Sequence, residues 1–381
     1  MRELILSNMI KNLIILHLSL VKGVGPAHIN RILETISVDD LSDLYAWSSS
    51  DFVNRCGLSI QTSLDLVAGL DDTQMLDQEC SSLEKENVHV LSLFDDVYPA
   101  LLRAIHMPPV VLYYKGQALQ DSVPAIAFVG ARAATPYGKK IVDALVPPLA
   151  QQGWNIVSGG AIGVDSYSHQ AAVQAGGKTT VVLGSGLMHL YPKQNKRLFS
   201  DVLATGGTLL SPFSMRVEAL PGHFPARNRI IAGLSKACVV VQAAQKSGSL
   251  ITASFALEQG RDVFAVPGHF DDPMSVGCHA LFKQGAHIAT SAQDIMLECG
   301  HDIQLNNVQA STEQFIQTTI TMGTANSVES DPLLFLCKYP ISIDELEQKT
   351  NLSLLELQTK LFDLQLEGKV IQNFMGMWQT Q

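Results

Sequence analysis

The sequence predicts a doubly wound, mostly parallel α/β sheet. Between residues 125 and 289, six short β-branched runs alternate with helical stretches, and each run is apolar at nearly every position. Strands covered by helices on both faces require such continuous apolar runs. Alternation with helices favours parallel strands joined by right-handed crossovers. The expected strands are Ala125–Val129, Asn155–Val157, Thr179–Leu183, Gly207–Leu210, Ala237–Val241 and Asp262–Val266.

Residues 1–85 predict a separate helical domain, because their helical periodicity is broken only by short polar turns. Between Leu20 and Ile29 the order helix, glycine turn, helix resembles a helix-hairpin-helix or SAM-like domain. Such a turn can bring backbone amides close to a phosphate. A plain helical bundle is the alternative, and the acidic side chains at 39, 40 and 43 favour it because they oppose a polyanion.

The chain is expected to continue with a core domain at 86–298, a polar linker at 299–330 and a small domain at 331–381. The linker is rich in Gln, Asn, Thr and Ser. The last segment predicts three helices and a short hairpin, which is the order of a winged helix-turn-helix. It holds four Lys and seven Asp or Glu, so contact with a protein is at least as well supported as contact with duplex DNA.

Composition limits the class of protein. The 381 residues are 46% hydrophobic and 16% charged, which excludes a disordered or fibrous chain. The six cysteines form no C-x-x-C pair, so a reduced, cytoplasmic environment is expected. The apolar stretch Leu13–Val21 is too short to span a bilayer and is not followed by a signal-peptide cleavage pattern.

The net charge of −10 hides a basic sheet region. Residues 126–290 contain 14 Lys or Arg and eight Asp or Glu, a net charge of +6. Their cations follow the expected strands, and the second strand runs into the glycine loop Ser158–Gly163. Because the carboxyl ends of parallel strands meet at one edge, these groups are expected to line one anion-binding cleft. The cations are Arg132, Lys193, Lys196, Arg197, Arg227, Arg229 and Lys246.

Signatures of nucleotide chemistry are missing. Gly177-Lys178-Thr179 resembles the end of a Walker A loop but precedes a strand, and no G-x-G-x-x-G, H-E-x-x-H or G-x-S-x-G motif is found where it would be needed. No metal or cofactor is expected, because the histidines lack ligand spacing. Asp165 is a conceivable general base, but a helix cap is the simpler interpretation.

A flexible single strand of nucleic acid suits such an edge better than a rigid duplex. Arg227 and Arg229 are expected to fork onto phosphate oxygens, and Tyr137, Tyr191 or Phe224 to meet unstacked bases. The spacing of these residues leaves the choice between DNA and RNA open.

In this order the loops resemble the DprA/Smf family, the bacterial DNA-processing proteins of natural transformation. The resemblance covers residues 95–290. It rests on Val129-Gly130-Ala131-Arg132, Ser158-Gly159-Gly160-Ala161, Tyr191-Pro192-Lys193-Gln194-Asn195 and above all on the segments 224–235, 247–253 and 260–268. Three positions depart from the family pattern: Ile162 replaces an Arg, Pro212 a Glu, and Gln242 a Glu.

The resemblance implies a Rossmann-like domain that binds single-stranded DNA, forms a homodimer and loads RecA recombinase. No catalytic residue and no membrane contact is expected. The expected DNA-binding residues are Gly130, Arg132, Ser158, Gly159, Gly160, Gly163, Lys193, Asn195, Arg227, Asn228, Arg229, Lys246, Ser247, Gly248, Ser249 and Thr252.

Two other functions are weighed against this one. A nucleotide-binding hydrolase could use Asp165 or Glu218 on a small nucleoside phosphate, but an acid/base pair is missing. A transcription factor could read duplex DNA with the winged helix, but the acidic charge of residues 331–381 disfavours it.

Overall fold

The computed structural model describes residues 2–300, 332–338, 341–350, 352, 354–366, 369–372 and 377–380. The chain divides into two compact units, Met1–Ile303 and Gln304–Gln381. Most of the stretch expected to be a linker, residues 301–330, lies outside the described residues.

The first unit is built on a nine-stranded sheet with the order β1-β2-β6-β5-β4-β3-β7-β8-β9. All neighbours from β6 to β9 are parallel, whereas β2 pairs antiparallel with both β1 and β6. The mostly parallel Rossmann-like sheet is therefore confirmed, and the six expected strands lie within one residue of their predicted bounds. The strands are β1 His89–Ser92, β2 Val111–Gly116, β3 Ala125–Val129, β4 Asn155–Ser158, β5 Thr179–Val182, β6 Thr208–Ser211, β7 Ala237–Val240, β8 Asp262–Ala265 and β9 His287–Ile288.

Helices cover both faces of the sheet, as the continuous apolar strands require. Successive side chains of β3 point to opposite faces of the sheet and so into two different cores. Phe128 packs in a core with helices α7, α8 and α13, and Ala127 in a core with α10, α11 and α12. The helices of this region are α6 Ala100–Arg103, α7 Pro136–Gln151, α8 Val164–Gln174, α9 Lys196–Ala204, α10 His223–Gly233, α11 Gly248–Glu258, α12 Val276–Lys283 and α13 Ala292–Glu298, with a 3-10 turn at Lys193–Asn195.

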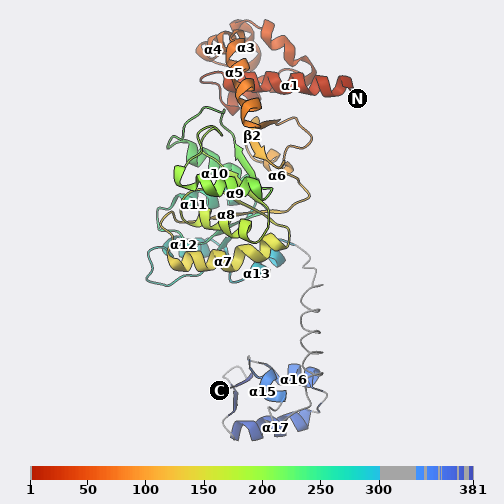
Figure 1. Ribbon diagram of the computed structural model, residues 1–381, viewed down its shortest axis with the longest axis vertical. Coiled ribbons are helices and arrows are strands. Elements are labelled where there is room, and N and C mark those ends of the chain that lie inside the picture. Colours follow the sequence, from red (N-terminus) through yellow and green to blue (C-terminus); the bar gives the residue numbers. More distant parts are fainter. Residues whose placement is uncertain are drawn as a thin grey trace. The chain divides into compact units, whose positions relative to one another are not determined.

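The N-terminal helices pack beside β2 (Figure 1) and share one apolar core with the sheet. That core joins Ile15 and Leu66 of the helices to Tyr113 of β2 and Leu209 of β6. Glu79 is buried there, and its carboxylate accepts the amide of Met215 at 2.8 Å. The elements are α1 Arg2–Leu20, α2 Pro26–Leu33, a 3-10 helix Val38–Ala46, α3 Ser49–Cys56, α4 Ile60–Asp71 and α5 Thr73–Glu86.

Where the structure describes the second unit, three helices and an antiparallel hairpin surround a core of its own, which includes Leu346, Leu361 and Trp378. Its described elements are α15 Pro332–Leu336, α16 Ile343–Lys349, α17 Leu354–Leu366, β10 Val370–Gln372 and β11 Trp378–Thr380. Among the residues that the structure describes, no helix is both long enough and apolar enough to cross a membrane.

Candidate functional site

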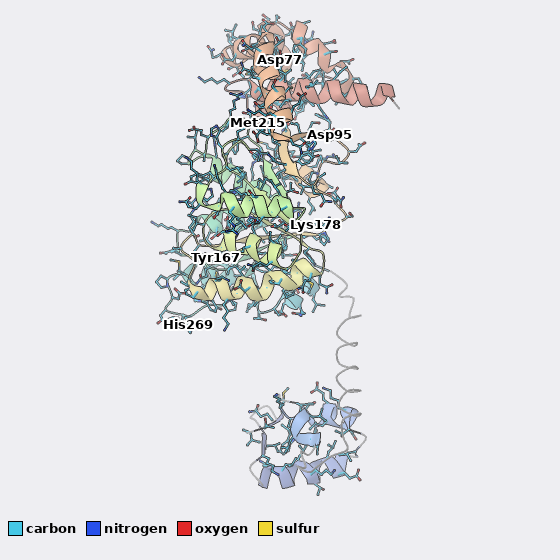
Figure 2. All side chains as sticks on the ribbon, viewed as in Figure 1. Asp77, Asp95, Tyr167, Lys178, Met215 and His269 are labelled. Atoms are coloured by element: carbon cyan, nitrogen blue, oxygen red, sulfur yellow. The ribbon has the colours of Figure 1, made fainter. Side chains whose placement is uncertain are left out.

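The carboxyl edge of the parallel sheet brings the predicted loops together. Read across the sheet, the loops that leave β5, β4, β3, β7 and β8 follow one another, with neighbouring strands about 5 Å apart. Strand order reverses at β3, where ligands of open α/β sheets bind. Figure 2 shows His269, from the loop after β8, and Lys178, directly before β5, on opposite sides of the unit. We call the loops at the carboxyl edge the rim.

Three adjoining hollows make the rim a continuous groove. Arg132 and Phe224 line both the first hollow, of about 220 Å³, and the second, of about 260 Å³. Tyr191 lines both the second and the third, which has about 330 Å³. The first also contains Gly130, Asn228, Ser247, Gly248 and Thr252, the second Gly159 and Ile162, and the third Lys193, Lys196 and Glu218.

Five of the seven cations expected at this rim are exposed: Arg132, Lys193, Lys196, Arg197 and Lys246. The Arg132 guanidinium lies 5.6 Å from the centre of the Phe224 ring, and the rings of Phe224 and Tyr191 are 5.8 Å apart. A cation over an aromatic ring is attracted to its face and stays solvated on its other side. The groove therefore offers positive charge and aromatic faces to the same ligand.

The position of Arg227 contradicts the prediction that its guanidinium forms a bidentate contact with a phosphate. Only 5% of the residue is exposed, and its Nη1 donates to the carbonyl of Gly159 at 2.6 Å and to that of Val182. Burial lowers the pKa of Arg227 to about 10. A guanidinium bonded to two backbone carbonyls holds the ends of β4 and β5 together, because both carbonyls need a donor when buried.

Arg229 also differs from its prediction. Its Nη1 donates to the carbonyls of His106, at 3.5 Å, and Met107, in the segment after α6. Burial lowers the pKa of Arg229. The guanidinium is thus used to attach α10 to the chain before β2, and the Arg-Asn-Arg segment supplies no free phosphate fork.

Backbone contacts fix the shape of the glycine loop after β4. Asn195 donates from Nδ2 to the carbonyls of Gly160 at 2.9 Å and Ala161 at 3.3 Å. Asp165 accepts the Ala161 amide at 3.3 Å. The prediction that Asp165 caps the helix is wrong, since α8 begins after Gly163 and has no side-chain cap. Burial raises the pKa of Asp165, and the charge of Arg227 partly opposes that rise.

The sixteen predicted site residues therefore fall into groups. Arg132, Lys193, Lys246 and Gly248 are exposed. Gly130, Asn195, Asn228, Arg229 and Ser247 are half-buried, and Ser158, Gly159, Gly160, Gly163, Arg227, Ser249 and Thr252 are buried. The buried group shapes the rim from beneath.

Gln242 is a rim residue that sequence reasoning noted only as a departure. Its side-chain oxygen accepts the Thr135 amide at 3.0 Å, and its own carbonyl accepts the Ala131 amide at 2.8 Å. Both bonds hold the loop that carries Arg132. The signal in the sequence was a polar residue directly after an apolar strand, which has to be paired once buried.

Beneath the glycine loop, His169 is fully buried and neutral. The Thr179 hydroxyl donates to the Ile156 carbonyl at 2.6 Å, so it accepts from His169 Nδ1 at 2.7 Å. Burial, followed by repulsion from Arg227, lowers the pKa of His169 to about 3.

This burial predicts acid sensitivity. The unfolded chain takes up a proton on His169 below about pH 6.5, and the folded chain does so only near pH 3, so stability is complete above 6.5 and falls as the pH is lowered. From pH 7 to pH 5 the loss is about 2 kcal/mol. Urea unfolding of wild type and His169→Asn at both pH values measures it. The difference in the free energy of unfolding between pH 7 and pH 5 should be smaller in His169→Asn than in wild type. An equal difference in both proteins would show that His169 is not the group responsible.

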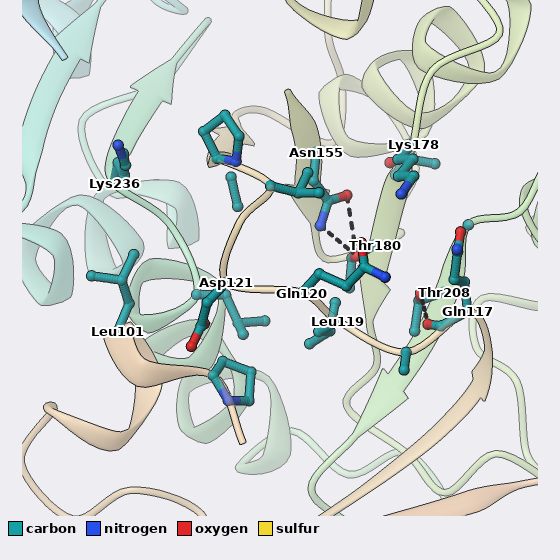
Figure 3. Close-up of a pocket in the computed structure, with 18 of the residues that line it drawn as sticks. Leu101, Gln117, Leu119, Gln120, Asp121, Asn155, Lys178, Thr180, Thr208 and Lys236 are labelled. Atoms are coloured by element: carbon teal, nitrogen blue, oxygen red, sulfur yellow. Dashed lines mark hydrogen bonds between the residues drawn. The ribbon is translucent and has the colours of Figure 1, made fainter. Parts of the chain in front are cut away.

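A further cavity, of about 260 Å³, lies at the opposite, amino-terminal edge of the sheet (Figure 3). Lys178 and Lys236 stand at its two sides. Asn155 and Thr180 hydrogen-bond to each other at 2.9 Å, and Asp121 accepts the Ala100 amide at 3.1 Å. The Asn155, Thr180 and Asp121 side chains are thus already hydrogen-bonded, and the cavity shares no lining residue with the rim.

Comparison with known proteins agrees with this geometry. The model of the DNA recombination-mediator protein A family matches residues 89–300. DNA processing protein DprA of Streptococcus pneumoniae is 44% identical over 223 residues, which are 58% of this chain and 78% of that protein. Protein Smf of Synechocystis is 35% identical over 291 residues, 74% of this chain and 71% of that protein.

Two solved structures are similar as well. The X-ray structure of S. pneumoniae DprA aligns with a TM-score of 0.64 and 37% identity, covering 75% of this chain and 97% of that one. A DprA structure from Helicobacter pylori, described for its single-stranded DNA binding mode, aligns with a TM-score of 0.50 and 29% identity. The alignment covers 55% of this chain and 94% of that one.

The sheet and the rim at its carboxyl edge define a Rossmann-like, doubly wound α/β protein, a class in which ligands bind at the carboxyl ends of the strands. Within that class, the chain belongs to the DNA recombination-mediator protein A family, also named DprA/Smf, and is a DNA-processing protein.

Proposed function

We propose that the rim binds single-stranded DNA and that this binding is the core of the protein's role in DNA processing. The observation that carries the proposal is the groove of three joined hollows, with exposed cations along it and aromatic rings between them. Repeated phosphates suit spaced cations, and unstacked bases suit aromatic faces. The contacts are assigned to Arg132, Lys193, Lys246, the half-buried polar groups of Asn195, Asn228 and Ser247, and the backbone at Gly130 and Gly248.

The proposal extends to the whole chain. A homodimer holds the strand and loads RecA recombinase in the cytoplasm, and the bound DNA is protected meanwhile. Residues 1–85 form a helical SAM-like domain, 86–298 the DNA-binding core, and 331–381 a winged helix whose net charge of −3 favours a protein contact. The H. pylori DprA structure, described for its single-stranded DNA binding mode, supports the DNA-binding part of this proposal.

Binding rather than chemistry is proposed at the rim. The hydrolase alternative would use Asp165 or Glu218 as a base. Only 8% of Asp165 is exposed, and its carboxylate accepts the Ala161 amide. Glu218 is exposed in the third hollow, where the other charged side chains of the lining are the cations Lys193 and Lys196 and not a second carboxylate. A general base must reach the proton that it removes. Among the described residues, no group of three or more His, Cys, Asp or Glu side chains is placed to hold a metal ion.

Charge reversal at the rim tests the proposal. Arg132→Glu and Lys246→Glu are each expected to weaken binding of an oligo-dT, because each removes a phosphate partner and adds a repelling charge. The slope of log affinity against log salt should fall by roughly 0.7 for each lost phosphate contact. Fluorescence anisotropy from 50 to 300 mM salt measures both quantities.

Lys178→Glu is the matched control, since it reverses an exposed lysine at the opposite edge of the sheet. It should leave the slope and nearly all affinity unchanged. If all three variants behave alike, the site of binding is not the rim.

A further inference from the structure

The loop between β8 and α12 carries a side chain that the groove does not explain. Phe270 is 93% exposed, the highest value among the large hydrophobic residues that the structure describes. Single exposed hydrophobic residues are common on protein surfaces, so exposure alone indicates nothing. The structure of its loop and its position on the sheet are what distinguish Phe270.

Hydrogen bonds at many points hold this loop in one shape. The Asp272 amide donates to the His269 carbonyl at 3.2 Å, which closes a turn with Phe270 at its second position. The Asp272 carboxylate then accepts the Met274 amide at 2.9 Å and the Ser275 hydroxyl at 3.3 Å. The Phe270 ring therefore projects from a turn that several hydrogen bonds hold in place.

Both ends of the turn are tied to the rim. The Tyr137 hydroxyl donates to the Pro267 carbonyl at 2.5 Å. The Ala243 amide donates to the Met274 carbonyl at 2.7 Å, and Ala243 stands three residues before Lys246. Since β8 is the neighbour of β7, the turn comes next along the sheet after the Lys246 loop, and His269 beside it lies at the outer side of the unit (Figure 2).

We propose that Phe270 is a stacking platform for one unpaired base, which lengthens the single-stranded DNA path by a nucleotide beyond Lys246. This inference rests on the function proposed above. Aromatic faces take up bases of any sequence, because every base has a flat π surface. Asp271 is exposed next to Phe270 and repels phosphate, so the contact uses the base and not the backbone.

A stacking contact has a signature that separates it from the cations. Phe270→Ala should weaken oligo-dT binding roughly tenfold, the usual size of one base–aromatic stack, while the salt slope stays as in wild type because no ion pair is lost. On an abasic oligomer of the same length, wild type and Phe270→Ala should bind equally. Ile60→Ala, at a site 70% exposed on α4, is the control and should change neither measurement.

Replacement by tryptophan gives a second readout. Phe270→Trp should bind oligo-dT as wild type does, and its added fluorescence, above that of the three native tryptophans, should be quenched by the oligonucleotide but not by the abasic strand.

The outcomes separate the two proposals. If wild type binds oligo-dT with a steep salt slope and Phe270→Ala binds equally well, the platform is overturned and the rim stands. If wild type shows no such binding, the function itself fails. If Phe270→Ala instead weakens self-association in sedimentation and leaves DNA binding intact, the ring is a protein contact and the proposal is wrong.

Discussion

Replacing Arg227 by methionine is expected to destabilise the fold by about 2–6 kcal/mol, because two buried carbonyls lose their donor and each such loss costs about 1–3 kcal/mol. The carbonyls of Gly159 and Val182 lose their donor, and the nearby Asp165 loses the positive charge that opposes its rise in pKa. Urea unfolding followed by circular dichroism measures the loss. DNA affinity should be compared at temperatures where the variant remains folded.

Arg132→Met is the matched change at an exposed arginine of the same rim. It should alter stability by less than about 0.5 kcal/mol, as surface substitutions do. It should also weaken single-strand binding, because Arg132 is free to meet phosphate. The reverse result, in which Arg227→Met folds normally and only loses DNA, would mean that the Arg227 guanidinium leaves its buried position to bind.

The central strands could be predicted because burial on both faces leaves a plain mark in the sequence. Phe128 and Ala127, which face opposite cores, are both apolar, and the same holds along β4, β7 and β8. The position of each loop relative to the edge of the sheet followed from the handedness of the crossovers.

Three strands of the sheet, β1, β2 and β9, were not predicted from the sequence. β2 contains the apolar run Val111–Tyr113 but pairs antiparallel, and its partners lie at 89–92 and 208–211, separations that local patterns do not reveal. β9 has two residues, too few for any periodicity. Pairing over long separations depends on the whole fold.

The positive charge of the site could be predicted from the sequence, but the burial of each cation could not. Arg132 and Arg227 look alike in the sequence, since each is an arginine in a segment that follows a strand. One is exposed and the other is buried because Gly159 has no side chain: a Cβ there would lie 2.5 Å from Arg227 Nη1. That approach of two segments 68 residues apart is visible only in three dimensions.

Gly163→Ala should have the other large effect, about 3–5 kcal/mol of stability together with a loss of single-strand affinity. Gly163 has φ 87° and ψ −131°, a conformation essentially limited to glycine. An added Cβ would lie 2.5 Å from the Arg132 carbonyl oxygen and closer still to that of Ala131, so the loop that carries Arg132 has to move.

Gly153→Ala separates the cost of the backbone conformation from the cost of steric contact. Gly153 also has a positive φ, 82°, but no atom lies within 4 Å of its added Cβ, so only the backbone term of about 1–2 kcal/mol remains. If steric contact with the Arg132 loop matters, Gly163→Ala loses more stability than Gly153→Ala and also loses oligo-dT affinity, whereas Gly153→Ala keeps it. Equal losses of stability and equal affinities would show that the glycine loop and the Arg132 loop move independently, and the rim would then not act as one preformed surface.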